Sequence, residues 1–216
     1  MKTPKVAIIV LAILAGFLFW LARNPAAMLS ITGRGGDVSN VSENIDVALE
    51  ETRYRAASGD LESQYDLAAQ LVMLDMTGTS PGFKEAEIWF RKAAAQGHLQ
   101  AQAFLCNVYY RGVAVPRVPT ETFRWCQGAA EAGNRLSQFW LGSIYESGEG
   151  IPQDYARARF WYTLAASGFD DNPAGKGLRE RLDHVESIMT EEQIAESESM
   201  LQAWTSGSED LAEVLQ

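Results

Sequence analysis

A repeat with a period of 36 residues constrains the fold of this chain more than any other sequence feature. Each of three tryptophans is followed four residues later by a pair of alanines, and the tryptophans are 36 residues apart: Trp89, Trp125 and Trp161. Upstream of each, a segment that begins with glycine recurs at intervals of 36 to 38 residues, at Gly59, Gly97 and Gly133. Self-similarity at this period is typical of proteins built from stacked structural repeats.

Within one repeat, apolar and small residues have helical spacing. Ala101, Leu105 and Tyr109 are four residues apart, and a second apolar face surrounds Trp125. The segment 112–119 interrupts this pattern with glycine and proline. Each repeat therefore predicts a helix, a turn and a second helix. Because a single helix pair cannot bury both of its faces, the pairs are expected to stack into an all-α solenoid.

The third repeat has small, aromatic and acidic residues at characteristic intervals: Ser137, Leu141, Gly142, Tyr145, Gly148, Gly150, Ile151, Asp154, Ala158, Trp161, Tyr162, Ala165 and Ala166. These residues resemble the Sel-one-like repeat, a relative of the tetratricopeptide repeat. The second repeat departs from the pattern, with Cys106 at a glycine position and Cys126 at a tyrosine position, and the first repeat has two extra residues in its loop. The resemblance covers 61–169 and implies a short right-handed solenoid of antiparallel helix pairs with about three units.

Helices flank the repeats in the expected domain order. One capping helix is predicted before them, and two closing helices follow, the second opening with a capping box at Thr190 to Gln193. The predicted segments are a membrane anchor or signal segment at 1–23, a flexible linker at 24–41, the capping helix at 42–58, the repeats at 61–169, the closing helices at 170–204 and an acidic tail at 205–216.

The N-terminal segment predicts contact with a membrane. The run Val6 to Ala22 has 17 uncharged residues, which is about 26 Å of helix at about 1.5 Å per residue. An uncleaved transmembrane anchor and a cleaved signal peptide, cut after Ala27, both remain open. In either case the positive residues concentrate before the apolar run, so the N-terminus is expected in the cytoplasm and the body outside it. The predicted location is the cell inner membrane, with a single span and a periplasmic body.

Charge and composition exclude several partners. The formal net charge is -10 and the isoelectric point is about 4.7, so a nucleic-acid backbone would be repelled. With two cysteines and two histidines, the chain has no zinc-binding cluster, and no metal or cofactor is predicted. Residues 191–216 carry seven acidic and no basic side chains. This acidic end either repels anionic lipid or docks on a basic partner.

The two cysteines lie on the two helices of the second repeat. An exported body is exposed to an oxidising compartment, so a disulfide between Cys106 and Cys126 is one interpretation. Two buried free thiols are the other. A redox function is not expected because the chain has no C-x-x-C motif.

No catalytic residue is predicted, and the chain is not expected to be an enzyme. His98 occupies the repeat position of Asp60 and Asn134, which favours a polar residue at a helix start, and His184 lies among charged residues of a surface helix. No hydrolase motif is present. Neighbouring carboxylates are interpreted as solvated loop charges: Glu146 with Glu149, and Asp170 with Asp171.

A partner-binding surface is predicted on the outward side of the first helices of repeats two and three, which line the concave face in superhelical arrays. The repeated tryptophans are assigned to the core, whereas Trp140 replaces Asp66 and Phe104 of the sister repeats and is a candidate contact. The candidate residues are Asn107, Tyr110, Arg111, Trp140, Ser143 and Ser147.

These features predict a membrane-anchored, exported adaptor of bacterial type that holds a protein or peptide partner in the cell envelope. The resemblance implies scaffolding and no more than that, because a fold does not determine function. Two alternatives remain. One is a periplasmic protein that binds or hydrolyses cell-wall fragments or β-lactams, and the other is an endoplasmic-reticulum adaptor.

Overall fold

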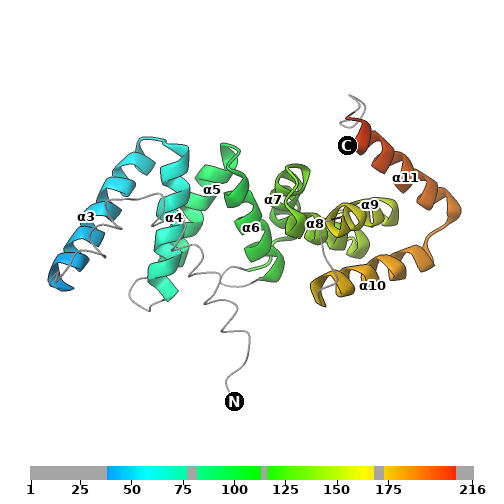
Figure 1. Cartoon of the computed structure of the whole chain (residues 1–216), viewed down its shortest axis with the longest axis horizontal. Helices are drawn as coiled ribbons and strands as arrows, with labels where there is room; N and C mark the ends of the chain where they lie inside the picture. Colours follow the sequence, from blue (N-terminus) through cyan, green and yellow to red (C-terminus); the bar gives the residue numbers. More distant parts are fainter. Residues whose placement is uncertain (1–37, 77–81, 113–115, 168–172, 208–216) are drawn as a thin grey trace, which may run out of the picture. The chain divides into compact units, whose positions relative to one another are not determined.

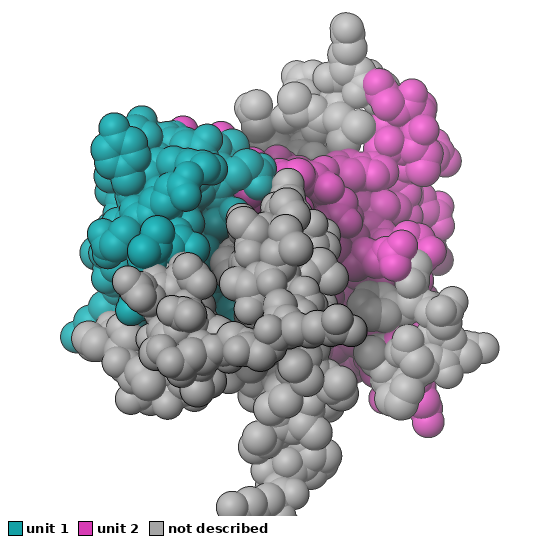
Figure 2. All heavy atoms as spheres, turned by 60° about the vertical axis from the view of Figure 1, so that its left-hand side comes forward, with its two compact units in different colours: residues 1–92 teal, residues 93–216 magenta. Residues whose placement is uncertain are grey.

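A computed structural model describes residues 38–76, 82–112, 116–167 and 173–207. All regular structure in these ranges is α-helical, which confirms the predicted all-α solenoid (Figure 1). The chain divides into two compact units, Met1–Lys92 and Ala93–Gln216 (Figure 2). Among the described helices, none is long and apolar enough to cross a membrane. The predicted anchor at 1–23 lies outside the described residues, as do most of the linker, Asp170, Asp171 and residues 208–216.

The first unit contains the N-terminal helix and most of the first repeat. Helix α3 (Val38–Ala57) begins four residues before the predicted capping helix and packs on α4 (Leu61–Met76). Helix α5 (Gly82–Ala95) carries the repeat's second apolar face and crosses the boundary between Lys92 and Ala93. The ring of Tyr65 on α4 meets Phe90 on α5 edge-on, with the ring centroids 5.7 Å apart.

The second unit contains two helix pairs and the closing helices. Helices α6 (Leu99–Arg111) and α7 (Pro119–Glu131) form one pair, and α8 (Arg135–Ser147) and α9 (Tyr155–Ala166) form the next (Figure 1). Helices α6 and α7 both contact α8, so one pair stacks on the other. Helices α10 (Pro173–Ile188) and α11 (Glu191–Ser206) cover α9.

Each repeat starts with the same capped turn. A glycine with positive φ precedes a polar N-cap residue, whose side chain accepts a hydrogen bond from a backbone N–H three residues on. The cap is Asp60 in the first repeat, His98 in the second and Asn134 in the third, with distances of 2.8, 3.3 and 2.9 Å. The helix-starting role expected for His98 is confirmed. Hydrogen bonds from Ser63 lower the pKa of the Asp60 carboxyl.

A recurring glutamine ties each of these turns to the preceding helix. Its side-chain NH₂ donates to the carbonyl of an alanine eight residues earlier, at 3.3, 3.1 and 3.1 Å, in the pairs Gln64 with Ala56, Gln102 with Ala94, and Gln138 with Ala130. These carbonyls lie near helix C-termini, where intrahelical donors run out. Each of these carbonyls also accepts the backbone N–H of the turn glycine, Gly59, Gly97 or Gly133. The glutamine therefore adds a second hydrogen bond, which links the start of each repeat's first helix to the end of the preceding helix.

The small-to-large contact within a pair is clearest in the third repeat. Gly142 on α8 faces the ring of Tyr162 on α9, and a Cβ at Gly142 would lie 2.7 Å from Tyr162 Cδ1. Trp161 and Trp125 are buried as predicted, whereas Trp89 is partly exposed. The helices of this pair can approach closely only because residue 142 has no side chain.

Glu146 corrects the sequence interpretation. It belongs to the last turn of α8 and not to a loop, and its carboxylate accepts a hydrogen bond from Tyr162 Oη at 2.6 Å. The Arg181 guanidinium on α10 lies 3.4 Å from the same oxygen. Burial and Glu146 raise the pKa of Tyr162 far above its usual range, so this phenol stays protonated and donates. The interaction joins α8, α9 and α10.

Trp204 closes the C-terminal end of the array. Its indole ring on α11 meets the rings of Phe160 and Trp161 edge-on, each at 5.7 Å. The predicted capping box of α11 is confirmed, with Thr190 Oγ1 accepting from the Gln193 N–H at 3.3 Å and the Gln193 side chain accepting from the Thr190 N–H at 3.0 Å. The closing helices thus cover apolar surface on α9.

The close contact at Gly142 makes a testable prediction. Gly142→Ala is expected to lower the free energy of unfolding by about 1–3 kcal/mol, because the new methyl group would overlap the Tyr162 ring. Gly177→Ala on α10 is the matched control. Nothing lies within 4 Å of a Cβ there, so alanine is expected to stabilise the helix by about 0.5–1 kcal/mol. Urea denaturation followed by circular dichroism measures both, and equal stabilities for the two variants would contradict the packing argument.

Candidate functional site

The outward face of α6 carries three of the predicted binding residues. The buried residues of α6 occupy one side of the helix: Ala101, Leu105, Cys106, Val108 and Tyr109. Asn107, Tyr110 and Arg111 occupy the opposite side because residues three and four positions apart share a helix face. Arg111 is exposed, and Asn107 and Tyr110 are partly buried.

Two aromatic residues and a serine from α6 and α8 form a cluster. The Tyr110 ring stacks on the Trp140 indole with centroids 4.2 Å apart and an interplanar angle of 27°. The Tyr110 hydroxyl lies 2.7 Å from Ser143 Oγ, within hydrogen-bonding distance. Trp140 is partly buried, and its Nε1 has no hydrogen-bond partner among the described residues. The sequence placed these residues on one surface, and the structure brings them into contact.

Ser143 and Ser147 have supporting positions. Ser143 is only 5% exposed, so its hydroxyl holds Tyr110 in place and is not presented to solvent. Ser147 is exposed, but its hydroxyl donates to the Ile144 carbonyl at 3.2 Å and accepts the Glu149 N–H at 3.3 Å. Ser147 therefore stabilises the end of α8. The accessible part of the surface consists of Asn107, Tyr110, Arg111 and Trp140.

The sequence analysis missed Arg117 on this surface and interpreted its ion-pair partner, Glu149, only as a solvated loop charge. The Arg117 guanidinium lies 4.9 Å from the centroid of the Tyr110 ring and forms an ion pair with Glu149. Arg117 precedes α7, and Glu149 follows α8. The repeat pattern treats both segments as breaks between helices, so no periodicity pointed to them. We call Asn107, Tyr110, Arg111, Arg117 and Trp140 the α6/α8 face.

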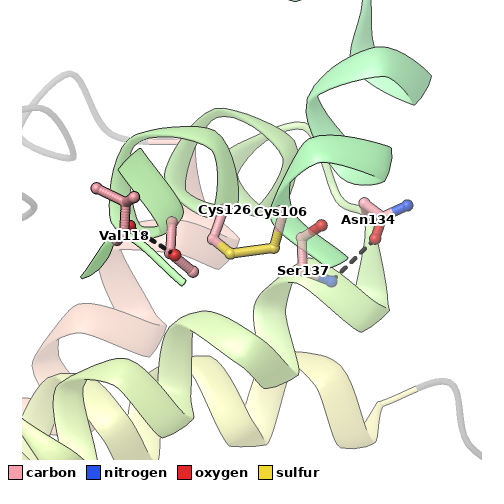
Figure 3. The surroundings of a disulfide bond; sticks show 6 residues. Cys106, Val118, Cys126, Asn134 and Ser137 are labelled. Carbon is pink, nitrogen blue, oxygen red and sulfur yellow. Dashed lines mark hydrogen bonds between the residues drawn. A yellow bond between two sulfur atoms is a disulfide. The ribbon is translucent and has the colours of Figure 1, made fainter. Parts of the chain in front are cut away.

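The two cysteines form a disulfide between α6 and α7 (Figure 3). Both side chains are fully buried, and their Cα atoms are 4.7 Å apart. The sequence had left this bond open against two free thiols. Cys106 and Cys126 occupy the same repeat positions as Gly142 and Tyr162 in the next pair. The second repeat therefore replaces a small-to-large packing contact with a covalent bond.

The remaining titratable candidates do not converge. Among the described residues, no group of three or more His, Cys, Asp or Glu side chains could hold a metal ion. His98 is buried with its Nδ1 engaged in helix capping, and His184 is exposed on α10. Glu146 is occupied by Tyr162 and Arg181. In the described ranges, the α6/α8 face is thus the candidate site with the most support.

Comparison with protein families agrees with the repeat architecture. The Sel1 repeat profile matches residues 61–98, 99–134 and 135–168, together half of the chain. The chain belongs to the Sel1 repeat family. An α-solenoid of this family is a scaffold for protein–protein interaction.

Two solved structures show the same fold. A Sel1 repeat protein from Oxalobacter formigenes is 33% identical, with a TM-score of 0.51, and the match covers 63% of this chain and 98% of that one. A protective antigen of uropathogenic Escherichia coli with an SLR fold is 29% identical, with a TM-score of 0.59. That match covers 88% of this chain but spans only 38% of the antigen. No curated protein matches the chain.

The disulfide in the second repeat and the glycine–tyrosine contact in the third repeat are expected to have the same role, which is to hold the two helices of a repeat together. This expectation can be tested by mutation. Cys106→Ser with Cys126→Ser is expected to lower the free energy of unfolding by roughly 3 kcal/mol, because the bond closes a loop of 20 residues. Cys106→Gly with Cys126→Tyr installs the residues of the sister pair. This variant is expected to lose less stability than the serine pair, by about 1 kcal/mol, because a buried ring replaces two polar hydroxyls.

Urea denaturation of both double variants, with the reduced wild-type chain as a further reference, measures these differences. A serine pair as stable as the oxidised wild type would contradict the stabilising role of the disulfide. A glycine–tyrosine pair less stable than the serine pair would contradict the equivalence of the two contacts.

Proposed function

We propose that this chain is an exported adaptor that holds a protein partner in the cell envelope through the α6/α8 face. The observation that carries the proposal is the stacked pair Tyr110 and Trp140, which is partly exposed while Trp125 and Trp161 are buried. Partly exposed aromatic residues beside arginine are typical of interfaces that bind other proteins.

The polar residues around this stack favour partner binding over a purely structural role. Arg111 is exposed, and within the described part of the chain neither the Arg111 nor the Asn107 side chain forms a hydrogen bond or an ion pair. Tyr110, in contrast, is held by Ser143 and Arg117. A rigid aromatic platform flanked by uncommitted donors loses little conformational entropy when a partner binds.

Two independent features support placing the adaptor at the inner membrane with its body in the periplasm. The apolar run at 6–22 is preceded by Lys2 and Lys5, which favours a cytoplasmic N-terminus. The disulfide between Cys106 and Cys126 favours an oxidising compartment for the body. The first feature comes from sequence alone and the second from the structure, so each supports the topology separately.

The proposed topology predicts the outcome of protease protection. In spheroplasts, added protease is expected to digest the body without lysis, because the body faces the exterior of the inner membrane. Digestion only after lysis would show that the orientation is wrong. The mass of the mature protein separates the two N-terminal alternatives, since an uncleaved anchor retains all 216 residues and a signal peptide cut after Ala27 removes the first 27.

The proposed binding face predicts site-specific crosslinking in cells. A photo-reactive amino acid at position 107 of the tagged full-length chain is expected to capture one stoichiometric envelope protein, identified by mass spectrometry. The same amino acid at position 124, an exposed site on α7, is the matched control and is expected to capture none.

Trp140→Ala, combined with the photo-reactive residue at position 107, is expected to reduce the crosslink at least fivefold, because removal of a central aromatic residue at an interface costs more than about 1 kcal/mol. Circular dichroism of this variant verifies that it folds. Equal capture from positions 107 and 124, or none from position 107, would refute this binding face.

A further inference from the structure

The first helices of repeats two and three differ in charge from the chain as a whole. The chain has a formal net charge of -10, yet the α6 sequence contains no aspartate or glutamate. The α8 sequence contains one, Glu146, and its carboxylate is engaged by the Tyr162 hydroxyl and the Arg181 guanidinium. The described part of the α6/α8 face therefore lacks an uncommitted carboxylate.

Two guanidinium groups lie on this face. Arg111, at the end of α6, is exposed and has no ion-pair partner among the described residues. Arg117 lies over the Tyr110 ring, and its charge is matched by Glu149. The side chains of Arg117 and Glu149 are 40% and 38% exposed, respectively. Among the described residues, the uncompensated charge on the face is thus positive and is located at Arg111.

The polar groups on α6 match the chemistry of an acidic peptide. A guanidinium donates two parallel hydrogen bonds to a carboxylate, and an asparagine amide can both donate to and accept from a peptide backbone. Asn107 and Arg111 are four residues apart, so both extend from one side of α6, and Arg111 directly follows Tyr110, whose ring stacks on Trp140. An extended segment crossing α6 and α8 would meet the Arg111 guanidinium, which binds a carboxylate, and the Asn107 amide, which binds peptide backbone. It would also meet the two aromatic rings, on which an apolar side chain can rest.

We propose that the partner segment bound by the α6/α8 face is an extended acidic peptide. Its carboxylate pairs with Arg111, and an apolar side chain next to that carboxylate rests on the Tyr110 and Trp140 rings. This inference rests on the proposed adaptor function and adds the chemistry of the partner. A basic segment is disfavoured because it would bring like charge to Arg111. The rest of the chain is negatively charged and repels an acidic peptide, so the attraction must come from Arg111.

Selection from a random dodecapeptide phage library tests the proposal and does not require the partner to be identified first. The full-length chain, held through a C-terminal tag in mild detergent, is used as bait in three forms: wild type, Arg111→Gln and Arg124→Gln. Arg124 is the matched control because it is also an exposed arginine, on α7, and has no ion pair among the described residues. Wild type and Arg124→Gln are expected to enrich peptides with aspartate or glutamate next to an apolar residue, and Arg111→Gln is expected to lose this enrichment.

Affinities of the synthetic selected peptide give the quantitative test. Arg111→Gln is expected to weaken binding about fivefold to tenfold, as is replacement of the peptide carboxylates by amides, because a hydrogen bond to a charged group is lost. Arg124→Gln is expected to change the affinity less than twofold. The ratio of the wild-type affinity to the Arg111→Gln affinity is expected to fall as salt is added, because salt screens the attraction between Arg111 and the peptide carboxylate.

The outcomes separate this inference from the proposed function. Selection of neutral or basic peptides, or equal affinities for wild type and Arg111→Gln, would overturn the acidic-peptide inference. If crosslinking from position 107 still captures a partner in that case, the adaptor function stands without it. Absence of both selected peptides and a crosslinked partner would overturn both.

Discussion

The close approach of the two helices within each repeat is the constraint on which the rest of the second unit depends. In the third repeat this approach requires Gly142, because any side chain there would overlap the Tyr162 ring. The same two positions hold Cys106 and Cys126 in the second repeat, where a covalent bond joins the helices. Neighbouring repeats thus hold their two helices close together at the same positions, one by packing and the other by a covalent bond. With Tyr162 held at this position, its hydroxyl reaches Glu146 and connects the pair to the closing helices.

The capped turns and the recurring glutamines make the same contacts in successive repeats. Each glutamine side chain bonds a carbonyl near the end of the preceding helix, so the same hydrogen bond forms at the start of every repeat. In the second unit, this regular stacking brings α6 beside α8. Tyr110 can then stack on Trp140 and bond Ser143 across the boundary between repeats. The candidate face is therefore a product of stacking, since neither helix contains it alone.

The adaptor proposal and the acidic-peptide inference rest on different observations. The first depends on the partly exposed aromatic stack. The second depends on Arg111, which has no ion pair with any residue that the structure describes, and on the absence of free carboxylates on α6 and α8. An aromatic platform supplies affinity for many partners, whereas charge restricts which partner is accepted. In both proposals the Sel1 repeats are the scaffold. Residues that differ between repeats, such as Trp140, form the proposed binding surface.

The helices, their turns and their caps could be predicted from the sequence alone, because periodicity, glycine position and capping residues act over only a few residues. His98 is an example, since its role followed from Asp60 and Asn134 at the same repeat position. The tertiary structure alone decided the choice between a disulfide and free thiols, the burial of Ser143, the engagement of Glu146 and the position of Arg117 over Tyr110. These contacts join residues on different elements, and they depend on distances between helices that no local pattern encodes.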